Sequence, residues 1–144
     1  MRLSTRTLYG LRLMFQLGAH FDNPGPLQLR EICAREQISE KYMSAIIMLL
    51  KAQGLVHSVR GAQGGYRLAE APGKISLYDV VECLEGEMLP VPETEGVCLD
   101  DSQCAVNEVW GKLQKGVRQI LDDMTLEDVL VSHQKFTKVG DYSI

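Results

Sequence analysis

The sequence predicts a mainly α-helical fold with one small β-hairpin, and its hydrophobic periodicity is the basis of this prediction. Apolar residues recur every three or four positions over residues 4–21, 40–53 and 103–124, which is the pattern of amphipathic helices. Two short runs of alternating apolar residues, at 55–59 and 66–68, flank a glycine-rich segment, which is typical of a hairpin. With 144 residues, the chain has the length of one ordinary domain.

The first half of the chain has the layout of a helix-turn-helix. The first helix ends at a proline- and glycine-rich break over 23–26, and a short helix is expected over 27–36. After a tight turn, Ser39 is suited to cap the helix at 40–53, because its hydroxyl can accept a hydrogen bond from a free backbone amide. A hairpin that follows a helix-turn-helix is a wing, so residues 1–75 are predicted to form a winged helix-turn-helix region.

The second half, residues 76–144, is predicted to contain an acidic loop and a long dimerisation helix. Capping sequences at Ser76 and Thr125 open two helices, the second of which is expected to be short and to end near Gln134. The apolar stripe of the helix at 103–124 is too long to be buried on one small winged helix, so its expected partner is the same helix of a second chain. The residues expected at this dimer interface are Val106, Val109, Trp110, Leu113, Val117, Ile120 and Leu121.

The charge of the chain is divided unevenly between its halves. The formal net charge is −4 at pH 7, which taken alone argues against nucleic-acid binding, because a basic balance is the usual footprint of that function. Residues 1–75 carry ten Lys and Arg against five Asp and Glu, a net of +5, whereas residues 76–144 carry five against fourteen, a net of −9. The two halves are therefore expected to do different work, with DNA contacts in the basic half.

Candidate DNA contacts lie on the second helix of the helix-turn-helix and at the tip of the wing. Apolar residues from Met43 to Leu50 share one face of the helix at 40–53, and the other face is free either for base edges and phosphates or merely for solvent. Arg60 on its thin glycine-rich loop suits a narrow minor groove, with a solvated arginine as the alternative. The candidate contacts are Arg2, Ser39, Lys41, Tyr42, Ser44, Arg60, Gly61, Gly64 and Gly65, with Arg6 and Arg67 as further phosphate candidates.

Four segments carry motifs at specific spacings. They are Leu3-Ser4-Thr5-Arg6-x-x-Tyr9-Gly10-Leu11-Arg12-x-Met14, Ile38-Ser39-Glu40-Lys41-Tyr42, Gly54-Leu55-Val56-x-Ser58-Val59-Arg60-Gly61-x-x-Gly64-Gly65-Tyr66 and Ser76-Leu77-x-Asp79-Val80-Val81-x-x-Leu84-Glu85-Gly86. Together they resemble the Rrf2 family of bacterial winged-helix transcription regulators, nearly throughout the chain to about residue 130.

The resemblance implies double-stranded DNA and a second copy of the chain as partners. Family members are homodimers joined through the long helix, bind palindromic operators and usually repress. The resemblance also places Arg60 in the minor groove and the helix around Tyr42 in the major groove. Members that bind an iron–sulfur cluster often have Glu-Gln where this chain has Ser44-Ala45, so their operator sequences are not carried over.

Two cysteines, Cys98 and Cys104, lie in or beside the acidic loop expected over 87–101. Family members with an iron–sulfur cluster show a Cys-x5-Cys-x5-Cys spacing, and some have a histidine three residues further on. Matched to that pattern, this chain has Pro92 in place of the first cysteine and Asn107 in place of the histidine. Because neither supplies a good ligand, a cluster here needs ligands from a second chain, a nearby carboxylate or a histidine such as His20.

Three interpretations of Cys98 and Cys104 stay open: an iron–sulfur cluster with unusual ligands, a thiol–disulfide switch, or a loop that senses something else or nothing. Neighbouring carboxylates weigh against the switch, because they raise the thiol pKa and slow attack. Cys33 and Cys83 occupy apolar positions of expected helices and are predicted to be small core residues.

Several classes of protein are disfavoured by what the sequence lacks. It has no nucleophile elbow, P-loop or dinucleotide fingerprint, so an enzyme is not expected. No apolar run approaches the length of a membrane span and no signal-peptide pattern is found, so a cytoplasmic location is expected. The alternative function is a regulator without a cluster that is controlled by complex formation with a partner protein, such as a metabolic enzyme.

Overall fold

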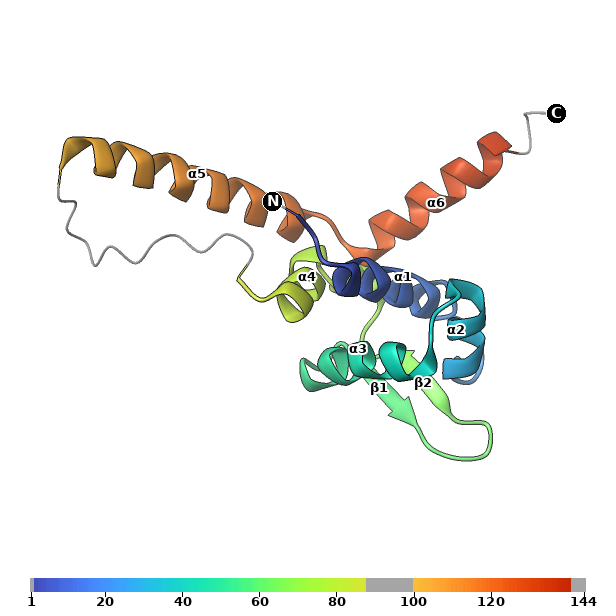
Figure 1. Ribbon diagram of the computed structural model, residues 1–144. Helices are drawn as coiled ribbons and strands as arrows, with labels where there is room; N and C mark the ends of the chain where they lie inside the picture. Colours follow the sequence, from blue (N-terminus) through green and yellow to red (C-terminus); the bar gives the residue numbers. More distant parts are fainter. Residues whose placement is uncertain (1, 88–99, 141–144) are drawn as a thin grey trace.

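The computed structural model describes residues 2–87 and 100–140, which form a head of short elements with two long helices projecting from it (Figure 1). The architecture is mainly helical with one two-stranded sheet, so the predicted fold class is confirmed. The elements in chain order are α1 (Thr5–Ala19), α2 (Leu29–Glu36), α3 (Glu40–Ala52), β1 (Val56–Val59), β2 (Gly65–Leu68), the 3-10 helix η1 (Pro72–Lys74), α4 (Leu77–Glu85), α5 (Asp101–Asp123) and α6 (Leu126–Gly140).

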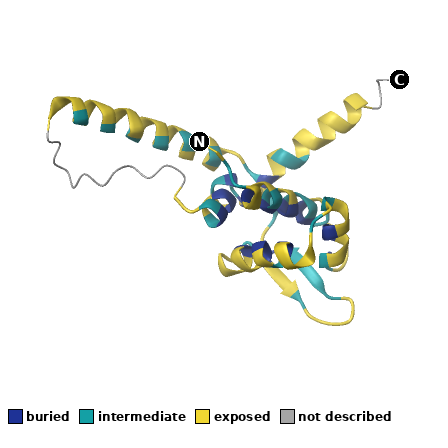
Figure 2. Cartoon of the chain, viewed as in Figure 1, coloured by how far each residue is buried: buried dark blue, intermediate teal, exposed yellow. Residues whose placement is uncertain are grey.

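The core of the head lies where α1 packs against α2, α3 and α4 (Figure 2). Leu13 and Leu17 of α1 share one buried cluster with Ile46 and Leu50 of α3 and with Leu84 of α4. Burying one such side chain stabilises the fold by about 1.5–3 kcal/mol. The residues predicted to face inward from α3 are all buried, so the orientation predicted for this helix is confirmed.

The two strands form the antiparallel hairpin that was expected as a wing, with Val56 opposite Leu68. The segment around Leu27 pairs with the hairpin. The amide of Leu27 donates to the carbonyl oxygen of Tyr66 at 3.0 Å, and the amide of Tyr66 donates to the carbonyl oxygen of Leu27 at 2.9 Å. This pairing fixes the wing against the segment that leads into α2. It also explains why α2 begins at Leu29, two residues later than the sequence pattern suggested.

The start of α5 and the end of α6 differ from the predicted positions. α5 begins two residues early, because the Asp100 carboxylate caps it by accepting the amide of Gln103 at 2.8 Å. The final helix was predicted to end near Gln134 and this was wrong, since α6 continues to Gly140. The 3-10 helix η1 was not predicted. Residues 88–99, which hold most of the expected acidic loop, lie outside the described residues.

Both long helices leave the head with much of their surface exposed. α5 projects to one side and α6 to another, and α5 has no fully buried residue (Figures 1 and 2). Val109 is 66% exposed, Ile120 is 62% exposed and Phe136 of α6 is 78% exposed. Among the described residues, no helix has the length and apolar character needed to cross a membrane.

The start of α1 is fastened to the end of α4 through Glu85. Its carboxylate accepts the amide of Ser4 at 2.5 Å. Hydrogen bonds from Thr7 and Ser4 hold the pKa of Glu85 below its ordinary value of 4.5. Because the folded-state pKa is depressed, the stabilisation is complete above the unfolded-state pKa and is lost as the pH falls through the folded-state pKa.

We expect Glu85→Gln to lower the melting temperature at pH 7 by about 3–6 °C, since it weakens a charged acceptor of two donors. The difference between the variant and the wild type should shrink as the pH falls from 7 through the lowered folded-state pKa of Glu85, because the wild-type carboxylate then takes up a proton. Thermal unfolding followed by circular dichroism across that range measures this difference. A gap that stays constant down to the lowest pH would contradict the role given to Glu85.

Candidate nucleic-acid interface

The outward face of α3 is the first part of the candidate interface. The helix begins at Ser39, whose hydroxyl oxygen accepts the amide of Tyr42 at 3.2 Å, as the sequence predicted for a cap. Lys41, Tyr42 and Ala45 are exposed, and Ser44 is half-buried. This face therefore presents a cation, two hydroxyls and small side chains at the N-terminal end of the helix, where recognition helices meet base edges.

The ring of Tyr42 has a defined support inside the head. It meets Tyr9 of α1 in an edge-to-face arrangement, with 6.1 Å between the ring centroids. Arg12 lies 5.9 Å from the centroid of the Tyr9 ring and forms an ion pair with Glu36 at 3.1 Å. These contacts restrict the side chain of Tyr42, so less conformational entropy is lost when it contacts a ligand.

The tip of the wing is the second part. It extends from the head on the same side as α3, and Arg60 at the end of β1 is exposed (Figure 1). Gly61 has a φ of 125°, a conformation that side chains disfavour, and it faces open space. Gly64 and Gly65 are instead packed closely against the chain's own backbone. A Cβ added to Gly64 would lie 2.4 Å from the carbonyl oxygen of Val59, and one added to Gly65 would lie 2.3 Å from that of Leu27.

The glycines of the wing were expected to let the backbone approach a partner. The close approach of Gly64 and Gly65 is to the protein itself, so these residues shape the wing whether or not they touch DNA. Gly61 is the one of the three whose exposed backbone faces away from the head.

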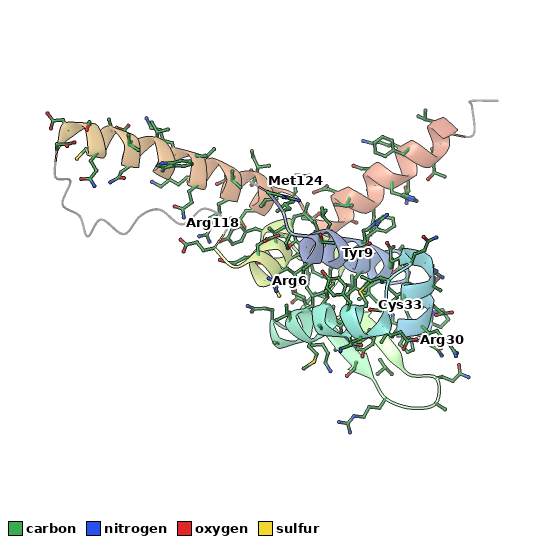
Figure 3. All side chains as sticks on the ribbon, in the orientation of Figure 1. Arg6, Tyr9, Arg30, Cys33, Arg118 and Met124 are labelled. Carbon is green, nitrogen blue, oxygen red and sulfur yellow. The ribbon has the colours of Figure 1, made fainter. Side chains whose placement is uncertain are left out.

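A shallow depression of about 340 Å³ joins the two parts and contains a residue that the sequence analysis missed. It is bounded by Gln28 and Arg30 of the α2 start, Glu40 of α3 and Gly61 and Gly64 of the wing. Arg30 is exposed beside this depression (Figure 3). In the sequence it is one of ten basic residues in the first half of the chain, and nothing local indicates that the first turn of α2 lies beside the wing.

Two arginines that were candidates for phosphate contact have partners inside the protein. Arg6 donates to the carbonyl oxygen of Leu84 at the end of α4. Arg67 donates to the carbonyl oxygens of Phe21 at 2.8 Å, of Asn23 at 3.2 Å and of Gly25. The bonds of Arg67 hold the segment between α1 and α2 in place, and that of Arg6 joins α1 to the end of α4, so both side chains have a structural role.

Arg2 lies apart from the α3 and wing residues. It is exposed before α1, whose first turn is fastened to α4. The structure thus places Arg30 beside the start of α3 and the wing. DNA contact by Arg2 stays a prediction, as it does for Lys41, Tyr42 and Arg60.

The cysteines fall into two groups. Cys33 is buried in the core, where burial raises the pKa of its thiol, with a smaller contribution from Glu40. Cys83 is half-buried and its thiol lies 3.4 Å from the carbonyl oxygen of Leu49, and burial raises its pKa as well. Cys33 is the core residue that was expected, whereas Cys83 packs against the edge of the core. A raised pKa makes both thiols poor nucleophiles. Cys104 is exposed in the first turn of α5, and Cys98 lies outside the described residues.

The donor chemistry around Cys104 does not fit an iron–sulfur cluster within the part of the chain that the structure describes. No group of three or more His, Cys, Asp or Glu side chains in residues 2–87 and 100–140 is arranged to hold a metal ion. The Asp100 carboxylate accepts from Ser102 and Gln103, and these bonds hold its pKa low. His20 ends α1, across the head from the start of α5 in one chain (Figure 1).

A comparison with known protein families bears directly on this arrangement. Residues 3–132 match the model of the family described as Rrf2, iron-dependent transcriptional regulator. The chain belongs to the Rrf2 family. Over 129 residues it is 37% identical to the HTH-type transcriptional regulator CymR of Bacillus subtilis, with 90% of this chain and 89% of the relative covered.

Two solved structures of Rrf2-like regulators extend the comparison to three dimensions. The structure of CymR, the global cysteine regulator of B. subtilis, matches with a TM-score of 0.78 at 35% identity and covers 92% of this chain and 98% of its own. That of T. potens IscR matches with a TM-score of 0.76 at 38% identity and covers 92% and 88%. The Rrf2 protein described here is therefore a winged-helix, DNA-binding transcriptional regulator and not an enzyme.

Proposed function

We propose that this Rrf2 protein acts as a homodimeric repressor on a palindromic operator. The observation that carries the proposal is an unpartnered stripe along α5. Its residues are spaced by four and three positions in alternation, which is the heptad spacing of two helices that pack together. The stripe consists of Val106, Trp110, Leu113, Val117, Ile120 and Met124.

The exposure of this stripe favours a second copy of α5 as its partner. Val106 is 55% exposed and Leu113 is 46% exposed. A helix of 23 residues is about 35 Å long, so the unpartnered stripe runs along much of that length. An apolar surface of this size on a soluble chain marks an interaction site. Val117 and Leu121 are both half-buried in their own chain. Of the seven residues predicted at the interface, five lie on the stripe, and Val109 and Leu121 do not.

In this proposal the two heads of the dimer contact DNA with α3 in the major groove and the wing in the minor groove. Lys41 and Arg30 neutralise phosphates, while Tyr42 and Ser44 reach base edges. Arg60 occupies the minor groove, where a narrow groove concentrates negative potential. The acidic half of the chain is only partly in the projecting helices, because α4, which carries Asp79, Glu82 and Glu85, packs against α1 and α3 within the head (Figure 1).

The test combines the oligomeric state with DNA binding. Sedimentation of the purified protein should give a dimer, and a mobility shift should show binding to the DNA upstream of its own gene. Transcription in vitro from that DNA should fall as the protein is added. A monomer, or a rise in transcription, would contradict the proposal. Binding that requires a second added protein would favour the alternative in which a partner protein controls the regulator.

We further propose that the signal acts at the segment that contains Cys98 and Cys104. Cys104 is exposed at the start of α5, at the end of the dimerisation helix that is farthest from the head (Figure 1). A change there can alter how two copies of α5 pack, and a signal shifts operator binding only through such a difference between states.

Anaerobic purification distinguishes the kinds of signal. Visible absorbance together with bound iron and sulfide would identify a cluster whose ligands extend beyond the described residues. Colourless protein whose operator affinity changes on oxidation, and not after Cys104→Ser, would identify thiol chemistry. Unchanged affinity under both conditions would contradict a signal at this segment.

A further inference from the structure

A cavity between α4 and α5 lies outside the candidate DNA interface and shares one lining residue, Val117, with the dimer stripe. Its volume is about 630 Å³, which is within the range of small-molecule sites. Tyr78 and Glu82 line it from α4, Glu87 lines it just beyond α4, and Lys115 and Arg118 line it from α5. The cavity therefore lies where α5 packs against α4 of the head.

The two walls of the cavity carry opposite charges. Glu82 and Glu87 supply carboxylates from the α4 side, and Lys115 and Arg118 supply cations from the α5 side. Arg118 is labelled in Figure 3. Arg118 also forms an ion pair with Asp122, one turn further along α5, at a distance of 3.5 Å. A dicarboxylate would be repelled by one wall and a diamine by the other, whereas a molecule with both an ammonium and a carboxylate group complements both.

An aromatic ring separates the charged groups. The guanidinium of Arg118 lies 4.6 Å from the centroid of the Tyr78 ring, and the Tyr78 hydroxyl donates to Glu82 at 2.7 Å. Val117 adds an apolar side chain to the lining, and Gly86 adds none. The lining thus offers an apolar surface for a side chain beside two walls for charged groups, which is the usual composition of a small-molecule site.

We propose that this cavity binds a free amino acid, with its ammonium group at Glu82 and Glu87 and its carboxylate at Lys115 and Arg118. The ligand bridges α4 and α5. α4 is in turn fixed to the head, because Glu85 accepts the amide of Ser4 and Cys83 contacts the carbonyl oxygen of Leu49 in α3. A bound amino acid therefore sets the angle between the head and α5, and its effect on the operator rests on the proposed dimeric function.

The binding test uses the full chain without DNA. Isothermal titration with each common L-amino acid, with succinate and with putrescine should show binding of at least one amino acid with a dissociation constant of about 1 mM or tighter, and no binding of the other two probes. No heat from any amino acid, or equal binding of succinate, would overturn the proposal. Because DNA is absent, failure of operator binding would leave this result unaffected.

Matched variants locate the site. Lys115→Gln should weaken amino-acid binding about tenfold, as expected for the loss of one charge-assisted contact. Lys112→Gln removes the same charge from the same helix one turn away, where Lys112 is exposed and paired with Glu108, and it should bind like the wild type. Equal binding by wild type and Lys115→Gln, or equal losses in both variants, would overturn the assignment. Tyr78→Phe keeps the ring but removes the hydrogen bond that positions the Glu82 carboxylate, so it should also weaken amino-acid binding.

Discussion

Replacing Arg60 by alanine is expected to weaken operator binding by about 5- to 150-fold for each half-site, which corresponds to the roughly 1–3 kcal/mol of a specific arginine contact. The side chain is exposed at the end of β1, on the side of the head that also presents α3. Its removal should leave the fold intact, since it is outside the core. In the minor groove it would also replace a counterion, so the slope of log affinity against log salt should fall by about 1 for each wing.

Fluorescence anisotropy on labelled operator DNA at several salt concentrations measures both effects, and thermal unfolding checks the fold. Arg60→Lys keeps the charge and should recover part of the affinity. Lys138→Ala removes a cation from the last turn of α6, away from the wing, and should leave operator affinity unchanged (Figure 1). If Arg60→Ala binds as tightly as the wild type at moderate salt, the wing has no direct part in recognition.

The features that the sequence predicted well are those set by residues close together in the chain. The inward face of α3 follows from its apolar period, and its start follows from the Ser39 cap, which involves an amide three residues away. The caps at Ser76 and Thr125 have the same local origin and are present. The Rrf2 family was identifiable for a similar reason, because its motifs have fixed spacings.

The features that the sequence did not predict depend on residues far apart in the chain. Arg67 was a phosphate candidate because a surface arginine near a wing suggests that role, yet it binds carbonyl groups more than forty positions earlier. Gly65 was predicted to contact a partner, but the space that a side chain would need is occupied by the backbone of Leu27. Arg30 was not predicted, because its place beside the wing depends on how the first turn of α2 packs near residues 61–64.

The second prediction concerns the centre of the α5 stripe. We expect the substitution Leu113→Asp, which places a charge there, to convert the dimer to monomers. Each dimer would have to bury two carboxylates in an apolar seam, and each costs several kcal/mol when unpaired. The dimer dissociation constant should therefore rise by roughly 10³-fold or more. The head should still fold, because α5 has no buried residue in the single chain.

Sedimentation equilibrium measures the change directly, and fluorescence of Trp110 reports it independently. This is the chain's one tryptophan, and it lies on the stripe, so its emission should shift to longer wavelength when the dimer separates. The matched control is Gln119→Asp, which adds the same charge to an exposed position of the same helix, off the stripe. A dimer that survives Leu113→Asp but not Gln119→Asp would place the interface on another face of α5.

Loss of the dimer should also reduce operator affinity, although Leu113 lies far from the DNA-facing side of the head. In a dimer, the first head to bind raises the effective concentration of the second head at its half-site, and this gain commonly reaches 10²–10⁴-fold. Leu113→Asp should therefore lose operator affinity without changing how a single head binds a half-site. Arg60→Ala should instead weaken binding to a single half-site as well as to the full operator. The two variants therefore separate contact with DNA from coupling between heads.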